Sequence, residues 1–104
     1  MLILQLSLLE EHDRCASIIS HIPHITAAAL VNLLDKNPND LESCITLAGG
    51  GFKDTTRIAS SNADMWADIC ISNSEPIIEH LSQLQSLLSG VITSIAKKRP
   101  PSHS

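Results

Sequence analysis

Two long segments of the chain repeat apolar side chains at intervals of three and four residues, which is the spacing of one face of an α-helix. The first covers residues 15–34 and the second covers residues 77–95. Residues 1–6 are typical of an extended, strand-like piece, and no later segment alternates as a strand does. The pattern predicts an all-α fold of about five helices. Two of these are long and broadly apolar, so we expect them to interleave with those of a second chain in a homodimer.

Capping residues and prolines predict where the helices begin and end. Ser7 and Glu10 match a capping box, so the first long helix should begin at Ser7. Pro23 removes a helical hydrogen bond and crowds the carbonyl four residues earlier, so this helix should kink or break there and end before residue 37. Further helices are expected at residues 41–47, at 53–60 with a break near Ser60 and Ser61, from an Asn62 N-cap through Asn73, and from Ser74 to residue 96.

The composition limits the kinds of partner. Of 104 residues, 43% are hydrophobic and 17% are charged, which is an apolar balance for one small domain. Some apolar surface should therefore be buried against a partner. With 11 acidic and 7 basic residues the net charge is −4, and there is no basic stripe, so a nucleic-acid partner is not expected.

Cysteine spacing and hydropathy indicate the compartment. Cys15, Cys44 and Cys70 are far apart and form no CxxC pair, as expected for reduced, mostly buried cysteines of a cytoplasmic protein. Residues 1–6 lack the basic n-region and cleavage site of a signal peptide. No run approaches the roughly 20 apolar residues of a membrane span, so we expect a soluble protein with no membrane partner.

The densest charge cluster in the interior of the chain follows the glycines Gly49–Gly51. Glycine accepts sharp turns and close approaches, and Lys53, Asp54 and Arg57 come directly after. If a helix begins near Phe52 or Lys53, its unpaired N–H groups and two cations point at one place, which would suit a carboxylate or phosphate. Arg57 is suited to bidentate binding of a carboxylate. The alternative is a glycine turn followed by a solvated charged helix.

Histidines and the single tryptophan are further candidates. His21 and His24 flank Pro23, where the predicted kink exposes backbone carbonyls. Their spacing would suit a metal, but no neighbouring Cys, Asp or Glu completes a ligand set, so no metal is expected. For these histidines and for Trp66 the alternative is a place in the core or on the surface. The chain has no GxGxxG, P-loop, GxSxG or HExxH motif, and so no nucleotide-binding element of its own.

Several motifs occur in the order found in a known family. From about Glu10 to Leu88, the chain resembles the C-terminal, dimer-forming helical domain of prephenate dehydrogenase, an enzyme of tyrosine biosynthesis. The implied fold is like that of the C-terminal domain of 6-phosphogluconate dehydrogenase. The motifs are Glu11-His12-Asp13-Arg14, Ile19-Ser20-His21-Ile22-Pro23-His24, Ala27-Ala28-Ala29-Leu30, the segment from Leu47 to Ala59 with its three glycines, Met65-Trp66 and Ile69-Cys70.

The resemblance implies a reaction. NAD or NADP takes a hydride from the carbinol carbon of prephenate, and the ring carboxylate leaves as CO₂ to give 4-hydroxyphenylpyruvate. In this family the cofactor and the general-base histidine belong to an N-terminal Rossmann domain, which would act in cis or in trans. Residues 1–9 are interpreted as a remnant of a linker or strand from that domain, 10–96 as the dimerisation and substrate-binding domain, and 97–104 as a disordered tail. The chain alone is expected to be inactive.

The resemblance also implies roles for individual residues. Arg57 would bind a prephenate carboxylate, and His24 would contact the substrate or the inhibitor tyrosine. Lys53 and Asp54 would form an ionic gate, and Trp66 would approach the site of the neighbouring subunit. His12 and Asp13 would lie at the start of the long helix. The complete substrate-binding set is His24, Gly50, Gly51, Lys53, Asp54, Arg57 and Trp66.

Two other functions stay open beside this one. A stand-alone helical dimerisation module would share the same core without any catalytic partner. An arogenate dehydrogenase would share the chemistry but would act on a substrate that bears an ammonium group. The charged residues Lys53, Asp54 and Arg57 favour the enzyme over the stand-alone module.

Overall fold

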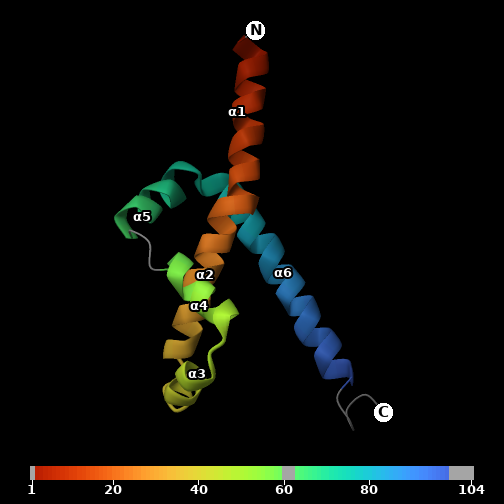
Figure 1. The fold of residues 1–104 in the computed structure, drawn as a ribbon. Helices are drawn as coiled ribbons and strands as arrows, with labels where there is room; N and C mark the ends of the chain where they lie inside the picture. Colours follow the sequence, from red (N-terminus) through yellow and green to blue (C-terminus); the bar gives the residue numbers. More distant parts are fainter. Residues whose placement is uncertain (1, 60–62, 99–104) are drawn as a thin grey trace.

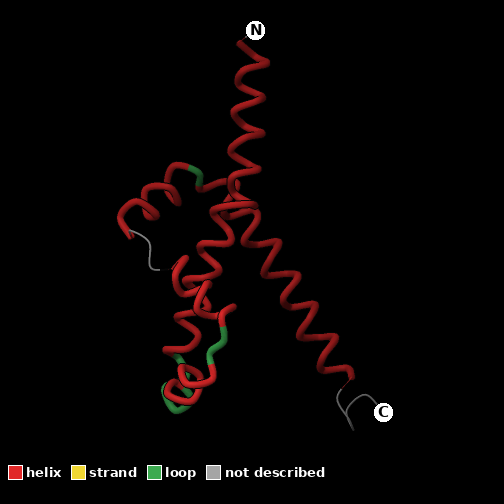
Figure 2. Tube along the Cα trace, in the orientation of Figure 1, coloured by secondary structure: helices red, strands yellow, loops and turns green. Residues whose placement is uncertain are grey.

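The computed structural model describes residues 2–59 and 63–98. Figures 1 and 2 show helices joined by short loops throughout these ranges. With α1, η1 and α2 taken as one continuous helix, the described part of the chain has five helical units, which confirms the all-α prediction. In chain order the elements are α1 (Leu2–Ala16), the π-helical segment η1 (Ser17–His21), α2 (Ile22–Asp35), α3 (Leu41–Leu47), α4 (Gly50–Ala59), α5 (Ala63–Ser72) and α6 (Ser74–Lys98).

The first long helix runs without a break from α1 through η1 to α2, and it changes its winding directly before Pro23. Proline has no N–H, and in a regular α-helix its ring would press against the carbonyl four residues earlier. Here the Ile22 N–H donates to the Ser17 carbonyl, five residues back, so the turn before the proline is wider by one residue. The predicted irregularity at Pro23 is therefore confirmed, as a π-helical turn.

The second long helix, α6, crosses the first near η1 and then diverges from α2 (Figure 1). α4 packs against α2, and α5 leads back to the start of α6. The chain measures 60 × 37 × 21 Å, with a radius of gyration of 17.9 Å. A compact domain of this length would have a radius of gyration of about 13 Å. The chain is thus too open to enclose a large core by itself.

The interior at the helix crossing is small and partly polar. Among the side chains that the structure describes, the buried apolar residues are Ala27 and Ile77, and the buried polar residues are Ser17, His24 and His80. Buried polar groups are tolerated where they are hydrogen-bonded. The crossing is therefore held by specific polar contacts as well as by apolar packing.

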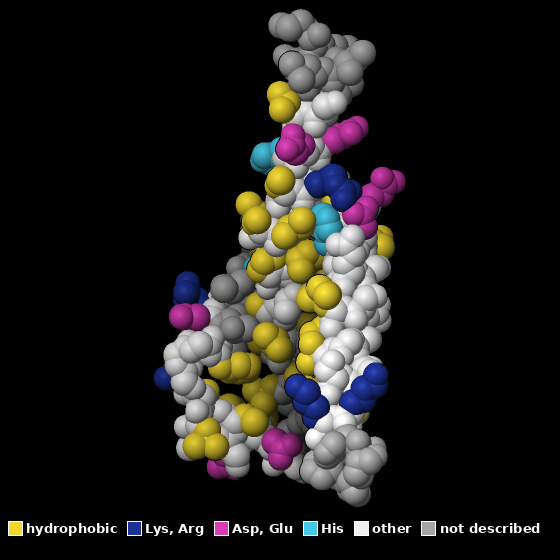
Figure 3. Space-filling view, turned by 90° about the vertical axis from the view of Figure 1, so that its right-hand side faces the viewer, with side chains coloured by type: hydrophobic (Ala, Val, Ile, Leu, Met, Phe, Trp, Pro, Cys, Tyr) yellow, Lys and Arg dark blue, Asp and Glu magenta, His cyan; other side chains and the backbone are white. Residues whose placement is uncertain are grey.

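Large apolar side chains lie instead on the outer faces of both long helices. The exposed fraction is 76% at Ile19 and 68% at Leu87. Figure 3 shows hydrophobic side chains gathered in a band along one face of the molecule. Exposed apolar surface on this scale marks an interaction surface. A groove between α2 and α6 is lined mainly by exposed and half-buried apolar residues, among them Ile25, Ala29, Ile78, Leu81, Leu84, Leu88 and Ile92.

The start of the first helix was predicted wrongly. Residues 2–6 are helical and not extended, so Ser7 and Glu10 lie inside α1 and do not cap its first turn. Leucine and glutamine are good helix formers, and the apolar run can simply continue the helix towards the N-terminus. The interpretation of residues 1–6 as a strand is therefore corrected.

Two other helix ends differ from the prediction. The helix α4 begins at Gly50 and not at Phe52 or Lys53. Glycine is tolerated there because the first-turn N–H groups of a helix need no helical partner. The Lys53 N–H donates to the Gly49 carbonyl at 3.2 Å. The last helix continues through Lys98, because cations suit a helix C-terminus. Ser60, Ser61, the Asn62 cap and residues 99–104 lie outside the described residues.

The expectation of mostly buried cysteines is corrected, and the expectation of no membrane partner stays a prediction. The cysteines are free, but Cys15 and Cys44 are exposed and Cys70 is only half-buried, because the chain encloses so little interior. The helix over residues 7–35 is long and apolar enough to cross a membrane by length and composition, with a mean hydropathy of 1.4. The core helix of a soluble protein passes the same test, and this helix carries Ser17, His21 and His24 in polar or ring contacts with α6 and α5.

Candidate functional site

Three rings from two helices form an aromatic cluster beside Pro23. His24 of α2 stacks on Trp66 of α5, with ring centroids 3.7 Å apart and an interplanar angle of 11°. His21, the last residue of η1, meets the same indole edge-on at 5.9 Å and 83°. Because η1 adds a residue to the turn, the two histidines approach the indole from different directions.

One polar atom of the cluster is buried without a hydrogen bond to the described residues. The Trp66 indole nitrogen Nε1 is buried, and it has no hydrogen-bond partner among the described residues. A buried N–H without an acceptor is unfavourable by about 1–3 kcal/mol. His24 itself is only 8% exposed, and this burial lowers the pKa of its imidazole below the usual value. The cluster thus presents a neutral histidine and a donor that lacks an acceptor.

Polar contacts from α6 and from Asn73, the residue before it, hold the segment that carries these rings. The buried Ser17 hydroxyl and His80 Nδ1 are 2.8 Å apart. The Asn73 amide nitrogen lies 2.9 Å from the Asp13 carbonyl oxygen and 3.2 Å from His21 Nδ1. These contacts fix η1 from both ends.

An ion pair on the surface supports the same crossing. Arg14 donates to both carboxylate oxygens of Glu79, at 3.2 Å and 2.5 Å. The hydrogen bond from Arg14, and then its charge, lowers the pKa of the Glu79 carboxyl below its ordinary value. Both side chains are about half exposed, so this pair adds only modestly to stability.

The charged residues of α4 lie on the surface. The Arg57 guanidinium is 3.4 Å from the Asp54 carboxylate one turn earlier, and both side chains are about three-quarters exposed. Lys53 is also exposed and lies in the preceding turn. α4, which carries these cations, packs directly on α2, the helix that carries His24.

The structure therefore brings together only part of the predicted substrate-binding set. His24 and Trp66 are in contact, and Asp54 and Arg57 are in contact. Gly50 and Gly51 form the first turn of α4, and a Cβ at either position would meet nothing within 4 Å. The substrate-binding roles of these residues stay predictions.

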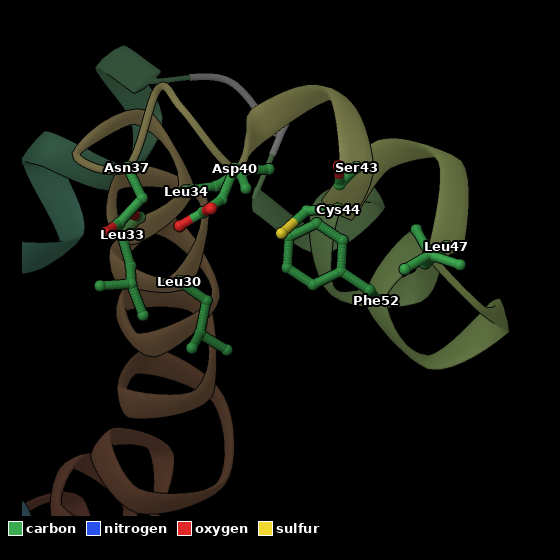
Figure 4. A pocket seen from close by; sticks show the side chains of 10 residues that line it. Leu30, Leu33, Leu34, Asn37, Asp40, Ser43, Cys44, Leu47 and Phe52 are labelled. Atoms are coloured by element: carbon green, nitrogen blue, oxygen red, sulfur yellow. The ribbon is translucent and has the colours of Figure 1, made fainter.

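A separate apolar pocket lies next to this region, between α2, α3 and α4. It has a volume of about 640 Å³, and Figure 4 shows Leu30, Leu33, Cys44, Leu47 and Phe52 around it. The residues of the predicted substrate-binding set do not line it. We therefore do not assign the substrate to this pocket.

Other candidates are placed differently from the sequence interpretation. His12 and Asp13 lie in the last turns of α1 and not at the start of the long helix, because that helix begins at Leu2. Their side chains approach within 3.6 Å of each other in solvent. Among the residues that the structure describes, no group of three or more His, Cys, Asp or Glu side chains is arranged to hold a metal ion.

Sequence reasoning missed Ser17, Asn73 and His80. A signal for them was present. Ser17 and His21 are four residues apart, and Asn73 and His80 are seven apart, so each pair lies on one helical face. Polar residues in register on the apolar faces of two long helices indicate a buried polar contact between those helices.

The chain was compared with known proteins. Residues 9–102 match the family described as "Prephenate dehydrogenase, dimerization domain". The prephenate dehydrogenase of Bacillus subtilis (strain 168) is 45% identical over 74 residues, which is 71% of this chain and 20% of that protein. The prephenate dehydrogenase of Lactococcus lactis subsp. cremoris is 35% identical over 89 residues, which is 86% of this chain and 25% of that protein.

A third relative has a different name. The cyclohexadienyl dehydrogenase of Zymomonas mobilis is 29% identical over 90 residues, which is 86% of this chain and 31% of that protein. The chain therefore spans between a fifth and a third of the length of these relatives.

Proposed function

Because this chain belongs to the family of prephenate dehydrogenase dimerisation domains, we propose that it binds prephenate and pairs two subunits of an NAD- or NADP-dependent prephenate dehydrogenase. The whole protein would carry out the oxidative decarboxylation of prephenate in tyrosine biosynthesis, in the cytoplasm. Tyrosine would bind the same site as an inhibitor.

The observation that carries this proposal is the stack of His24 on Trp66. It holds a neutral imidazole against an indole whose buried N–H needs an acceptor. Prephenate carries two carboxylates, and either can supply that acceptor. A carboxylate that accepted the indole N–H would remove the unfavourable burial of that donor.

The cations of α4 supply the complementary charge. Arg57 and Lys53 lie one turn apart in α4: Lys53 follows the first turn of the helix, where the helix dipole also favours an anion, and Arg57 lies in its last turn. Arg57 would bind a carboxylate of prephenate in bidentate fashion. Asp54, which already contacts Arg57, would hold that guanidinium in place and act with Lys53 as the gate of the site.

The described residues do not fit a binding site for the dinucleotide cofactor, NAD or NADP. A dinucleotide-binding unit needs a strand, a glycine-rich turn and a helix, and the described ranges contain helices joined by short loops. We propose that another part of the protein binds the cofactor, and we derive no step through it from this chain.

One experiment tests the proposal on the protein as a whole. A chimera is made in which this chain replaces the matching segment of the Bacillus subtilis enzyme. Arg57→Ala removes a charge-assisted hydrogen bond, and Trp66→Phe removes the indole N–H together with part of the stacked ring system, so both should raise KM for prephenate. The expected increase is about 10- to 100-fold for Arg57→Ala and about 5- to 10-fold for Trp66→Phe, with KM for NAD unchanged.

Lys98→Ala is the matched control, because it removes an exposed cation at the far end of α6. It should leave both KM values unchanged. An unchanged KM for prephenate in both site variants would contradict the proposal. A folded chimera that binds NAD but does not oxidise prephenate would favour the stand-alone module instead.

A second substrate is supported by one contact. Asp54 places a carboxylate beside Arg57, and such a pair could hold the ammonium and carboxylate groups of arogenate together. The relative named cyclohexadienyl dehydrogenase points to the same broader class of substrate. Assays of the chimera with prephenate and with arogenate, each at several concentrations, distinguish the two by kcat/KM.

A further inference from the structure

Asn73 lies between α5 and α6 and links both to the first long helix. Its backbone closes one helix and opens the next: its N–H donates to the Ile69 carbonyl at 3.0 Å, and its carbonyl accepts from the Ile77 N–H at 3.3 Å. Its side-chain nitrogen Nδ2 reaches the Asp13 carbonyl oxygen at 2.9 Å and His21 Nδ1 at 3.2 Å. These partners are 60 and 52 residues away in the sequence.

The chemistry of the two partners fixes the direction of both hydrogen bonds. A backbone carbonyl only accepts, so the Asn73 atom that faces Asp13 is the amide nitrogen and not the oxygen. The second hydrogen of this nitrogen then faces His21 Nδ1, which must present a lone pair. An imidazole that accepts at Nδ1 carries its proton at Nε2.

We infer that Asn73 is a positioning residue, which holds His21 in the tautomer protonated at Nε2 and so sets its ring against the stack of Trp66 on His24. The inference deepens the function proposed above and rests on it for the link to prephenate. His21 meets the Trp66 indole edge-on, and the indole stacks on His24. Asn73 therefore acts on the cluster through His21.

The contact also explains why an asparagine occupies this junction. Asparagine, aspartate and serine are equally good at a helix N-cap, so the cap alone does not need an amide. Of these three side chains, only asparagine has a nitrogen with two hydrogens to donate, one to the carbonyl and one to the ring. The identity of residue 73 is thus set by its two distant partners.

Asn73→Asp tests the inference with little change of side-chain size. Aspartate suits the N-cap position, but its carboxylate only accepts, so it loses the hydrogen bond to the Asp13 carbonyl and can contact His21 only by accepting a proton held at Nδ1. Long-range nitrogen–proton NMR on the full chain reports which ring nitrogen carries the proton, and His21→Gln identifies the signals. The parent should show His21 protonated at Nε2, and Asn73→Asp should show it protonated at Nδ1. Asn39→Asp, at an exposed loop position, is the control and should leave His21 unchanged.

Kinetics then test the positioning role. In the chimera, Asn73→Asp should raise KM for prephenate about tenfold, with KM for NAD unchanged. The NMR result alone overturns the inference if His21 in the parent is protonated at Nδ1. It also overturns the inference if His21 has the same tautomer in the parent and in Asn73→Asp. A tautomer switch with an unchanged KM overturns the positioning role. An inactive parent chimera would contradict the proposed function alone, because the NMR result needs no substrate.

Discussion

His24 determines how this domain should respond to pH. Its imidazole is buried against Trp66, and burial lowers its pKa from the usual 6.5. In the unfolded chain the same ring would titrate near that usual value. Between the folded and unfolded pKa values the unfolded state therefore binds more protons, and the free energy of unfolding must fall as the pH falls.

This difference can be measured by thermal unfolding of the parent and of His24→Gln. The parent should lose stability between about pH 7 and about pH 5, and His24→Gln should lose less over the same range. The comparison isolates His24, since the other histidines are the same in both proteins. Equal losses in the two proteins would show that His24 is not the group that titrates.

At this scale the sequence predicted some residues and missed others. His24 and Trp66 were predicted because each belongs to a motif that can be recognised without knowing its neighbours. Asn73 was predicted only as the end of a helix. Its position between two helices explains an asparagine locally, so this local pattern gives no reason to expect its side-chain contacts with Asp13 and His21. A contact between residues 52 positions apart depends on how the helices cross, which local patterns do not specify.

At the scale of elements, the π-helical segment η1 is held to α6 by a buried pair. Ser17 is fully buried and His80 is 7% exposed, with their polar atoms 2.8 Å apart. Removing one partner leaves the other buried and unpaired, which is more costly than removing both. The pair should therefore be strongly coupled.

A double-mutant cycle with Ser17→Ala and His80→Leu measures this coupling. Ser17→Ala alone should lower the free energy of unfolding by about 1–3 kcal/mol, and the double variant should lower it by less than the sum of the singles. Urea unfolding at one protein concentration gives these values. Ser20→Ala, exposed in the same segment, is the control and should change stability by no more than about 0.5 kcal/mol. Strict additivity would mean that the pair does not hold η1.

The accuracy of the element predictions followed the strength of the local signals. The helix at residues 41–47 was predicted with the bounds it has, because an Asn-Pro turn precedes it and glycines follow it. The starts of α1 and α4 were predicted wrongly, because a capping box and glycines also fit inside a helix or its first turn. The proline predicted an irregularity at residue 23, but its π-helical form depends on the packing of α6 against η1.

At the scale of the molecule, the chain exposes more apolar surface than a single copy can bury. Its radius of gyration is 17.9 Å, against about 13 Å for a compact domain of this length. Composition predicted this excess, the apolar repeats predicted that it lies along the two long helices, and the structure shows it along α2 and α6. A second copy that laid its long helices in the groove between α2 and α6 would bury it, as the family of dimerisation domains implies.

The measurement that tests the account most directly is the mass of the chain in solution by sedimentation equilibrium, with and without Leu88→Asp. Leu88 is 55% exposed in the groove, so an added charge there should oppose pairing. Ser86→Asp adds the same charge at an exposed polar position of α6 and is the control. We expect dimers for the parent and Ser86→Asp, and dissociation with loss of helix for Leu88→Asp. A stable, folded monomer of the parent chain would contradict the account.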